Sequence, residues 1–337
     1  MQISGIKEQD TAPLNPVLFH RERPVPPGFF SNHSACFSRT DTHSSPPKNL
    51  WSLPLTFSAM NGEGCPVVLV HGWKSHPGIW NRFNPLLSGE SFSAWNYGYD
   101  TLDDPSLADI ASGLRSFISD KRDETGYDGA LDFVCHCMGT VVARYLLEVM
   151  DGAVHRERVR LLIGLGPPNN GSSIAELFHD PDHGQGMIER LTGVFIPDGY
   201  DPVSDRIVRE FRPGSSPMGR LRETGLRNDI SYRLLLTENR PAVPEFFPTF
   251  TGRTWQFCGD RGWQMTCHGD GIVPHTDSFL PGAGLDILPL RPEGLGDTPY
   301  QYCHFNLPRN DEIMGRVLEY LRDPGLSPLR VCPGRQE

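Results

Sequence analysis

The sequence lacks several features that would point to particular classes of protein. It has no uninterrupted run of about 18 apolar residues, so no transmembrane segment is expected. Its net charge of -10 gives no cationic excess, which argues against a nucleic-acid partner. The eight cysteines form no paired CxxC set, and no motif implies a metal ion or an organic cofactor.

The first ten residues also lack the order of a secretory signal, in which a charged stretch precedes an apolar one. Polar and charged side chains, among them Lys7 and Asp10, occupy this end of the chain. We therefore expect a cytoplasmic protein with reduced thiols. No feature of the sequence specifies an oligomeric state.

What is present suits one large domain. The 337 residues are 38% hydrophobic and 21% charged, which allows a packed core. Residues 1–50 are rich in Pro, Ser and Thr and predict an extended or partly disordered N-terminal arm. Residues 51–325 are expected to form the folded domain, and residues 326–337 a C-terminal tail.

Apolar runs and helical patterns alternate within this domain. Strands are expected at 66–70, 93–97, 131–135 and 159–164, with helices from about 105 to 122 and from 141 to 150. The alternation predicts an α/β fold with a doubly wound, mostly parallel sheet. The stretch from about 171 to 250 breaks the rhythm and predicts a cap or lid insertion. Strands at 254–258 and 285–290 and a helix at 311–321 then follow.

The most informative segment is a tight turn between the expected strand at 131–135 and the helix after it. Cys137 stands at the centre of the turn, with the small residues Cys135 and Gly139 two positions to either side. The N-terminus of the following helix would favour a thiolate and a developing oxyanion. Two other interpretations exist: Cys137 is only a small buried residue, or Cys135, His136 and Cys137 bind a metal, although their spacing matches zinc sites poorly.

This segment resembles the nucleophile elbow of the α/β-hydrolase superfamily, whose usual pattern is Gly-x-Ser-x-Gly. Cys137 stands where serine is usual, and Cys135 stands where the first glycine is usual. Cysteine elbows also occur in this superfamily, for example in dienelactone hydrolases and polyhydroxyalkanoate synthases. The resemblance implies that Cys137 is the nucleophile.

Two further motifs favour the bacterial lipase-like branch of the superfamily. Residues 162–172 resemble its Gly-Thr-Pro-His-x-Gly-Ser stretch, and residues 213–218 resemble its Pro-Gly-Ser segment. A His-Gly pair at 71–72 follows the first apolar run, as in lipases. The resemblance implies that the backbone N–H groups of Trp73 and Met138 form the oxyanion hole, while the His71 side chain has a structural role.

The same resemblance places an acid and then a histidine after the nucleophile. Asp270 lies in an Asp-Gly-Ile-Val segment typical of the acid, and Asp260 is a competitor because it directly follows an expected strand. His304 precedes the last helix, where the catalytic histidine of the superfamily lies. His268 and His275 are alternatives, but both adjoin the proposed acid. The expected order is therefore nucleophile, acid, histidine.

These residues predict a lipase- or esterase-like enzyme that forms an acyl-enzyme from an ester or thioester, followed by hydrolysis. A thiolate is also a good leaving group, so transfer of the acyl group to an alcohol or amine is the alternative. A non-catalytic binding protein on the same scaffold is the second alternative. The expected partner is a small acyl substrate, with an apolar pocket closed by side chains of the insertion: Phe178, Leu191, Phe195 and Ile196. No role is assigned to Cys135 or Cys303.

Overall fold

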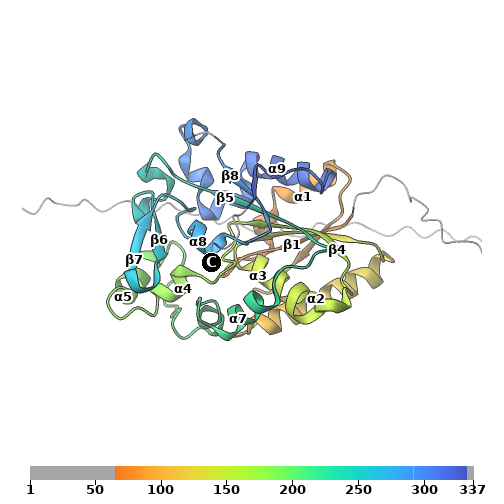
Figure 1. Cartoon of the computed structure of the whole chain (residues 1–337), viewed down its shortest axis with the longest axis horizontal. Helices are drawn as coiled ribbons and strands as arrows, with labels where there is room; N and C mark the ends of the chain where they lie inside the picture. Colours follow the sequence, from red (N-terminus) through yellow and green to blue (C-terminus); the bar gives the residue numbers. More distant parts are fainter. Residues whose placement is uncertain (1–64, 291, 332–337) are drawn as a thin grey trace, which may run out of the picture. The chain divides into compact units, whose positions relative to one another are not determined.

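A computed structural model describes residues 65–290 and 292–331 of the chain. The expected arm at 1–50 lies outside these residues. The main sheet runs in the order β2-β1-β3-β4-β5-β8-β9 (Figure 1). All of its strands are parallel except β9, which is antiparallel to β8. The strands are β1 (Val67–Val70), β2 (Ala94–Tyr97), β3 (Leu131–His136), β4 (Val159–Leu165), β5 (Ser231–Thr237), β8 (Gly284–Leu288) and β9 (Arg330–Val331).

Helices cover the two faces of this sheet. Figure 1 shows α1 and α9 on one side and α2 and α3 on the other. The doubly wound, mostly parallel α/β fold expected from the sequence is therefore confirmed. The helices are α1 (Phe83–Gly89), α2 (Leu107–Thr125), α3 (Met138–Arg144), α4 (Ser173–Leu177), α5 (Gly184–Leu191), α6 (Arg206–Glu210), α7 (Ser216–Thr224), α8 (His275–Ser278) and α9 (Asp311–Arg322), and a π-helical segment, η2 (Tyr145–Asp151), continues α3.

The central strands are buried on both faces, which explains their continuous apolar sequence. Every residue of β1 and β3 is buried. Helix α2 begins with a capping box in which the Ser106 and Asp109 side chains each accept from the other's backbone N–H. Ser106 is therefore the N-cap of this helix. The helix ends at Gly126, whose φ of 69° suits glycine.

The insertion is shorter than the sequence suggested. Residues Ser231–Thr237, inside the expected stretch of 171–250, form β5 between β4 and β8 of the main sheet. The helical part therefore lies between β4 and β5 and carries α4 to α7. Arg233 within the strand and the charged residues before it interrupt the apolar pattern, so β5 was not predicted. The strand accommodates Arg233 because its side chain donates to the backbone carbonyls of Pro324 and Leu326.

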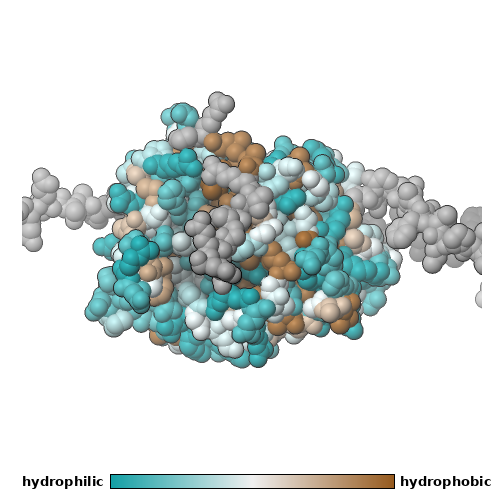
Figure 2. Space-filling view, in the orientation of Figure 1, coloured by the Kyte–Doolittle hydropathy of each residue, from teal (hydrophilic) through white to brown (hydrophobic). Residues whose placement is uncertain are grey.

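The strand expected at 254–258 belongs to a separate hairpin. β6 (Thr254–Phe257) pairs antiparallel with β7 (Trp263–Thr266), and neither joins the main sheet. The start of the expected tail at 326–337 is ordered, since Arg330–Val331 pairs with β8 as β9. Among the described residues, no helix is long and apolar enough to cross a membrane. The face drawn in Figure 2 is mostly hydrophilic, with separate hydrophobic patches.

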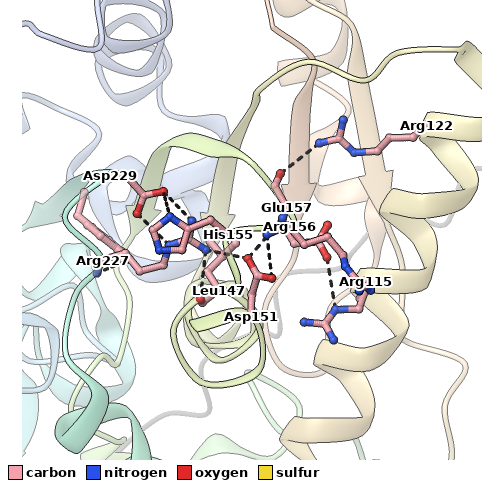
Figure 3. Close-up of polar contacts among 10 residues, drawn as sticks. Arg115, Arg122, Leu147, Asp151, His155, Arg156, Glu157, Arg227 and Asp229 are labelled. Carbon is pink, nitrogen blue, oxygen red and sulfur yellow. Dashed lines mark hydrogen bonds and ion pairs between the residues drawn. The ribbon is translucent and has the colours of Figure 1, made fainter. Parts of the chain in front are cut away.

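A network of charged side chains fixes the end of η2. The Arg227 guanidinium donates to Asp151 at 2.8 Å and to Asp229 at 2.6 Å (Figure 3). Arg115 lies 3.3 Å from the Glu157 carboxylate in the adjoining segment. Burial raises the pKa of Glu157, followed in effect by the charge of Asp151. These contacts hold the far end of the helical segment formed by α3 and η2, which begins directly after Cys137.

Candidate active site

Cys137 occupies a strained turn between β3 and α3. Its φ of 52° and ψ of -127° lie in a region that side-chain-bearing residues rarely adopt. Its N–H donates to the Leu165 carbonyl at 2.9 Å, and its carbonyl accepts from the Thr140 N–H at 3.1 Å. The residue is 7% exposed. The backbone thus presents the thiol at the carboxyl ends of the parallel strands.

The turn is possible because the backbone segments around it approach very closely. A Cβ on Gly139 would lie 2.4 Å from the carbonyl oxygens of both Val70 and His71. A Cβ on Gly72 would lie 2.8 Å from the Cβ of Cys137. Cys135, at the position of the missing first glycine, is tolerated as a fully buried residue of β3. Only Gly139 of the two expected glycines is therefore a strict requirement here.

We predict that Gly139→Ala lowers the free energy of unfolding by about 3 kcal/mol or prevents folding, since its methyl group would overlap two fixed backbone oxygens. The matched control is Gly315→Ala in α9, where a Cβ meets no atom within 4 Å. The control should be more stable than wild type by about 0.5–1 kcal/mol because alanine favours a helix. Urea denaturation followed by circular dichroism measures both. A Gly139→Ala protein as stable as wild type would contradict the close approach.

The structure brings Asp270 and His304 together. His304 Nδ1 lies 2.7 Å from Asp270 Oδ2, and both side chains are buried. The His304 backbone N–H also donates to the Asp270 carbonyl at 2.8 Å. The other carboxylate oxygen of Asp270 accepts from the N–H groups of Ile272 and Val273, at 3.0 and 2.7 Å. The acid is therefore held by its own turn and points one oxygen at the histidine.

The free nitrogen of His304 faces the other way. Nε2 is buried and has no hydrogen-bond partner among the described residues. Burial lowers the pKa of His304, but the charges of Asp270 and Cys137 outweigh it and raise the pKa to about 10. Cys137 is thus one of the two residues that raise the pKa of this ring. His304 Nε2 is the ring nitrogen left to exchange a proton, because Nδ1 is bonded to Asp270.

The other acid and histidine candidates lie elsewhere. Asp260 is exposed in the short helical turn Gly259–Arg261 between the strands of the hairpin. His268 and His275 flank the Asp270 loop and contact Glu238 and the Thr237 carbonyl, not the Cys137 turn. Among the described residues, Asp270 is the one acid candidate that bonds to His304, the expected catalytic histidine.

Trp73 and Met138, the expected oxyanion-hole residues, both lie beside Cys137. All three line the same pocket. The Met138 N–H is in the first turn of α3 and therefore has no partner within the helix. The Trp73 side chain donates to Asp205 of the insertion at 3.2 Å and stacks edge-on against Phe195 at 5.0 Å. The loop that carries the Trp73 backbone is thus tied to the insertion.

His71 has a structural environment. It is fully buried and stacks on Tyr99 with ring centroids 4.0 Å apart. The Tyr99 hydroxyl donates to the His71 carbonyl at 2.7 Å. Burial lowers the pKa of His71, which favours its neutral form. Tyr99 was not foreseen from the sequence, and its place at the end of β2 is the one signal that could have identified it.

The pocket in front of Cys137 is apolar. Its space is about 440 Å³ when its open mouth is included. Phe178 and Phe195 of the insertion line it as expected, whereas Leu191 and Ile196 are buried elsewhere in the insertion. The lining residues are Trp73, Cys137, Met138, Pro168, Ser172, Ile174, Ala175, Phe178, Phe195, Ile207, Val208, Phe211, Ile272 and Val273. Such a lining suits the hydrocarbon part of a substrate.

Cys135 and Cys303 differ from Cys137 in their surroundings. Burial raises the pKa of the Cys135 thiol well above its usual value, and it raises the pKa of Cys303 to about 11. Both thiols are therefore protonated and unreactive at neutral pH. His136, which the sequence had left as a possible metal ligand, bonds through Nε2 to the His304 carbonyl at 2.9 Å. It positions the histidine loop.

A doubly wound parallel sheet with a strained turn after the third strand, and an Asp–His pair on later loops, defines the α/β-hydrolase fold. No family model and no curated protein sequence matches the chain. Among solved structures, the mature lipase BlEst2 of Bacillus licheniformis has a TM-score of 0.54 at 17% identity, over 77% of this chain and 93% of that one. The phospholipase PlaB of Legionella pneumophila has a TM-score of 0.52 at 17% identity, over 77% and 60%. These likenesses establish the fold.

Proposed function

We propose that this chain is an acyl-processing enzyme in which Cys137 attacks an ester or thioester and the resulting acyl-cysteine is hydrolysed. One observation carries the proposal: the buried His304–Asp270 pair, 2.7 Å apart, leaves Nε2 with no partner among the described residues, and Cys137, which acts on the pKa of the same ring, stands in a strained turn. The fold neighbours include a lipase and a phospholipase, which is consistent with an ester substrate.

The chemistry follows from the positions of the groups. His304 Nε2 takes the thiol proton of Cys137, and the sulfur forms a bond to the acyl carbon. The N–H groups of Trp73 and Met138 stabilise the oxyanion. His304 then gives its proton to the departing alcohol or thiol, while Asp270 keeps Nδ1 protonated. A water molecule activated by His304 releases the acid and restores the thiol.

The lining of the pocket in front of Cys137 supports binding of the acyl chain of the substrate there. Its aromatic and aliphatic lining, including Phe178 and Phe211, suits an apolar acyl chain. Thioesters are favoured over unactivated esters, because their energy is closer to that of the acyl-cysteine. An unactivated ester faces expulsion of the thiolate before the alcohol leaves.

Acyl transfer is a second candidate, favoured by a polar groove that adjoins the apolar pocket. The groove shares Trp73, Met138 and Ile207 with that pocket and measures about 1310 Å³ including open solvent. Its polar lining includes Asp100 and Lys74. An alcohol or amine acceptor in this groove would lie next to Trp73 and Met138, the residues proposed for the oxyanion hole.

The test is the intact mass of the protein after incubation with a p-nitrophenyl acyl ester and with an acyl thioester. We expect one acyl group per chain, mapped by peptide mass spectrometry to Cys137. Adding an alcohol or amine should shorten the lifetime of the adduct if the acceptor route operates. Labelling spread over the partly exposed thiols of Cys65 and Cys267, or no labelling by either donor, would overturn the proposal.

A further inference from the structure

Three potential metal ligands meet behind the loop that carries Asp270. Glu238 directly follows β5, while His268 and His275 stand at the two ends of the loop. A ligand atom of each lies within 4.8 Å of those of the other two. Glu238 and His275 are buried, and the His268 side chain is 62% exposed. This cluster takes no part in the proposed chemistry of Cys137.

His275 is held as a metal-binding histidine usually is. Its Nε2 lies 2.9 Å from the Thr237 carbonyl, so Nε2 carries the proton and Nδ1 carries the lone pair. Metal-bound histidines typically donate their second ring nitrogen to a carbonyl or carboxylate in this way.

Glu238 and His268 supply the other two donors. His268 Nδ1 lies 3.1 Å from Glu238 Oε2. Two ligands bound at about 2.0 Å to a tetrahedral ion stand roughly 3.3 Å apart, so this spacing needs little adjustment. A metal ion would replace the proton that the two groups share. The second oxygen of Glu238 is paired with Arg240 Nε at 2.5 Å, which compensates the carboxylate when no metal is bound.

We propose that Glu238, His268 and His275 form a zinc site that holds together the two ends of the loop carrying Asp270. Two imidazole nitrogens and one carboxylate oxygen are a typical donor set for zinc, whereas magnesium and calcium prefer oxygen ligands alone. The exposure of His268 gives the ion a route from solvent and leaves the fourth position to water. No local motif signals this site, because Glu238 precedes His268 by thirty residues.

Zinc at this site would hold the two ends of the loop together. The loop is already closed by a bond of 3.0 Å from the His275 N–H to the His268 carbonyl and by the bridge between Gly269 and Pro274. A metal joining both histidines to the end of β5 would fix the backbone on which Asp270 stands. Zinc binding and its effect on stability would not depend on the acyl chemistry of Cys137.

The experiment uses the full chain stripped of metal by chelation and titrated with zinc. Isothermal titration and elemental analysis should give one tight zinc per chain, and zinc should raise the melting temperature. His268→Ala and Glu238→Gln should each weaken binding by about 100-fold, a loss typical of a missing ligand. The matched control is His183→Ala, because His183 forms an equivalent pair with Asp180 at 2.8 Å but is not in the cluster.

Cobalt distinguishes this site from one made by cysteines. Cobalt bound to two histidines and a carboxylate lacks the thiolate-to-metal charge-transfer band that a cysteine ligand produces. We expect visible d–d bands without that band, in wild type and in Cys137→Ala alike. Zinc affinity unchanged in both His268→Ala and Glu238→Gln, binding confined to thiols, or an absence of saturable zinc binding would overturn the proposal.

Discussion

Replacing Cys137 with alanine should reduce acyl turnover by about 10⁴-fold or more, the usual result of removing a nucleophile from a Cys–His or Ser–His site. The side chain is small and only 7% exposed, and alanine meets the same backbone strain, so the variant should fold. Initial rates with an acyl ester and an acyl thioester measure the loss. The acyl adduct should also disappear from the mass spectrum.

The matched control for this prediction is Cys258→Ala. Cys258 is a free thiol at the end of β6, in the separate hairpin. Its removal should leave turnover within about twofold of wild type, as for other surface changes. Comparable turnover by Cys137→Ala and Cys258→Ala would show that Cys137 is not the nucleophile, whereas an absence of turnover even in wild type would favour the non-catalytic scaffold.

Cys137→Ser separates the two acyl routes. Serine needs a neutral histidine as its base, and the pKa of His304 is raised in part by the charge of Cys137. Removing that charge should return His304 toward its neutral form. Ester hydrolysis by the serine variant would indicate that the residues around position 137 support lipase chemistry. Complete loss with both donors would favour a reaction that depends on the thiol itself.

The fold was largely predictable because its central strands are buried on both faces. Such strands read as continuous apolar runs, as in Val67–Val70, and each is followed by a clear helical pattern. β5 was not predicted because Arg233 interrupts its apolar run. The strand at 254–258 was predicted, but its pairing in a separate hairpin was not, because the sequence does not specify which strands pair. Secondary structure is local, whereas sheet membership depends on tertiary packing.

The residues of the candidate site also fall into those that a local sequence pattern predicts and those that only the tertiary fold brings together. Cys137 was proposed as the nucleophile from a motif a few residues long, Asp270 as the acid from its Asp-Gly-Ile-Val segment, and His304 as the histidine from its place before the last helix. The bond from Trp73 to Asp205 joins residues 132 positions apart, and no local pattern signals it. The metal cluster was missed for the same reason. Contacts of this kind exist only once the chain has folded, so their chemistry has to be read from side-chain positions.

Asp270→Asn should reduce turnover by about 10²–10⁴-fold without unfolding the protein, with the upper figure known from the equivalent change in a serine protease. The reason is geometric. One oxygen of Asp270 accepts from the Val273 N–H at 2.7 Å, and the other accepts from His304 Nδ1 at 2.7 Å. Asparagine has one oxygen and can serve only one of these donors. If the turn keeps it, the amide NH₂ faces Nδ1 and forces the ring proton onto Nε2, where it blocks transfer from Cys137.

The pH dependence of stability provides a second measure of the same change. The pKa of His304 is raised from 6.5 to about 10 in the folded protein. Protonated His304 therefore stabilises wild type fully below pH 6.5, and this contribution is lost as the pH rises toward 10. Asp270→Asn should lower the pKa of His304, so the free energy of unfolding should fall less between neutral and alkaline pH than in wild type. Urea denaturation at neutral and alkaline pH compares the two proteins.

Asp260→Asn is the decisive control, because Asp260 was the competing acid. It is exposed in the turn at Gly259–Arg261, where the same change of charge should leave turnover and the pH dependence of stability as in wild type. Equal losses in Asp260→Asn and Asp270→Asn would point to a general effect of charge. A loss only in Asp260→Asn would place the acid on the hairpin and require that segment to move toward His304. The expected result, a loss only in Asp270→Asn, requires the Asp270–His304 bond itself, since the two variants differ in that contact and not in their change of charge.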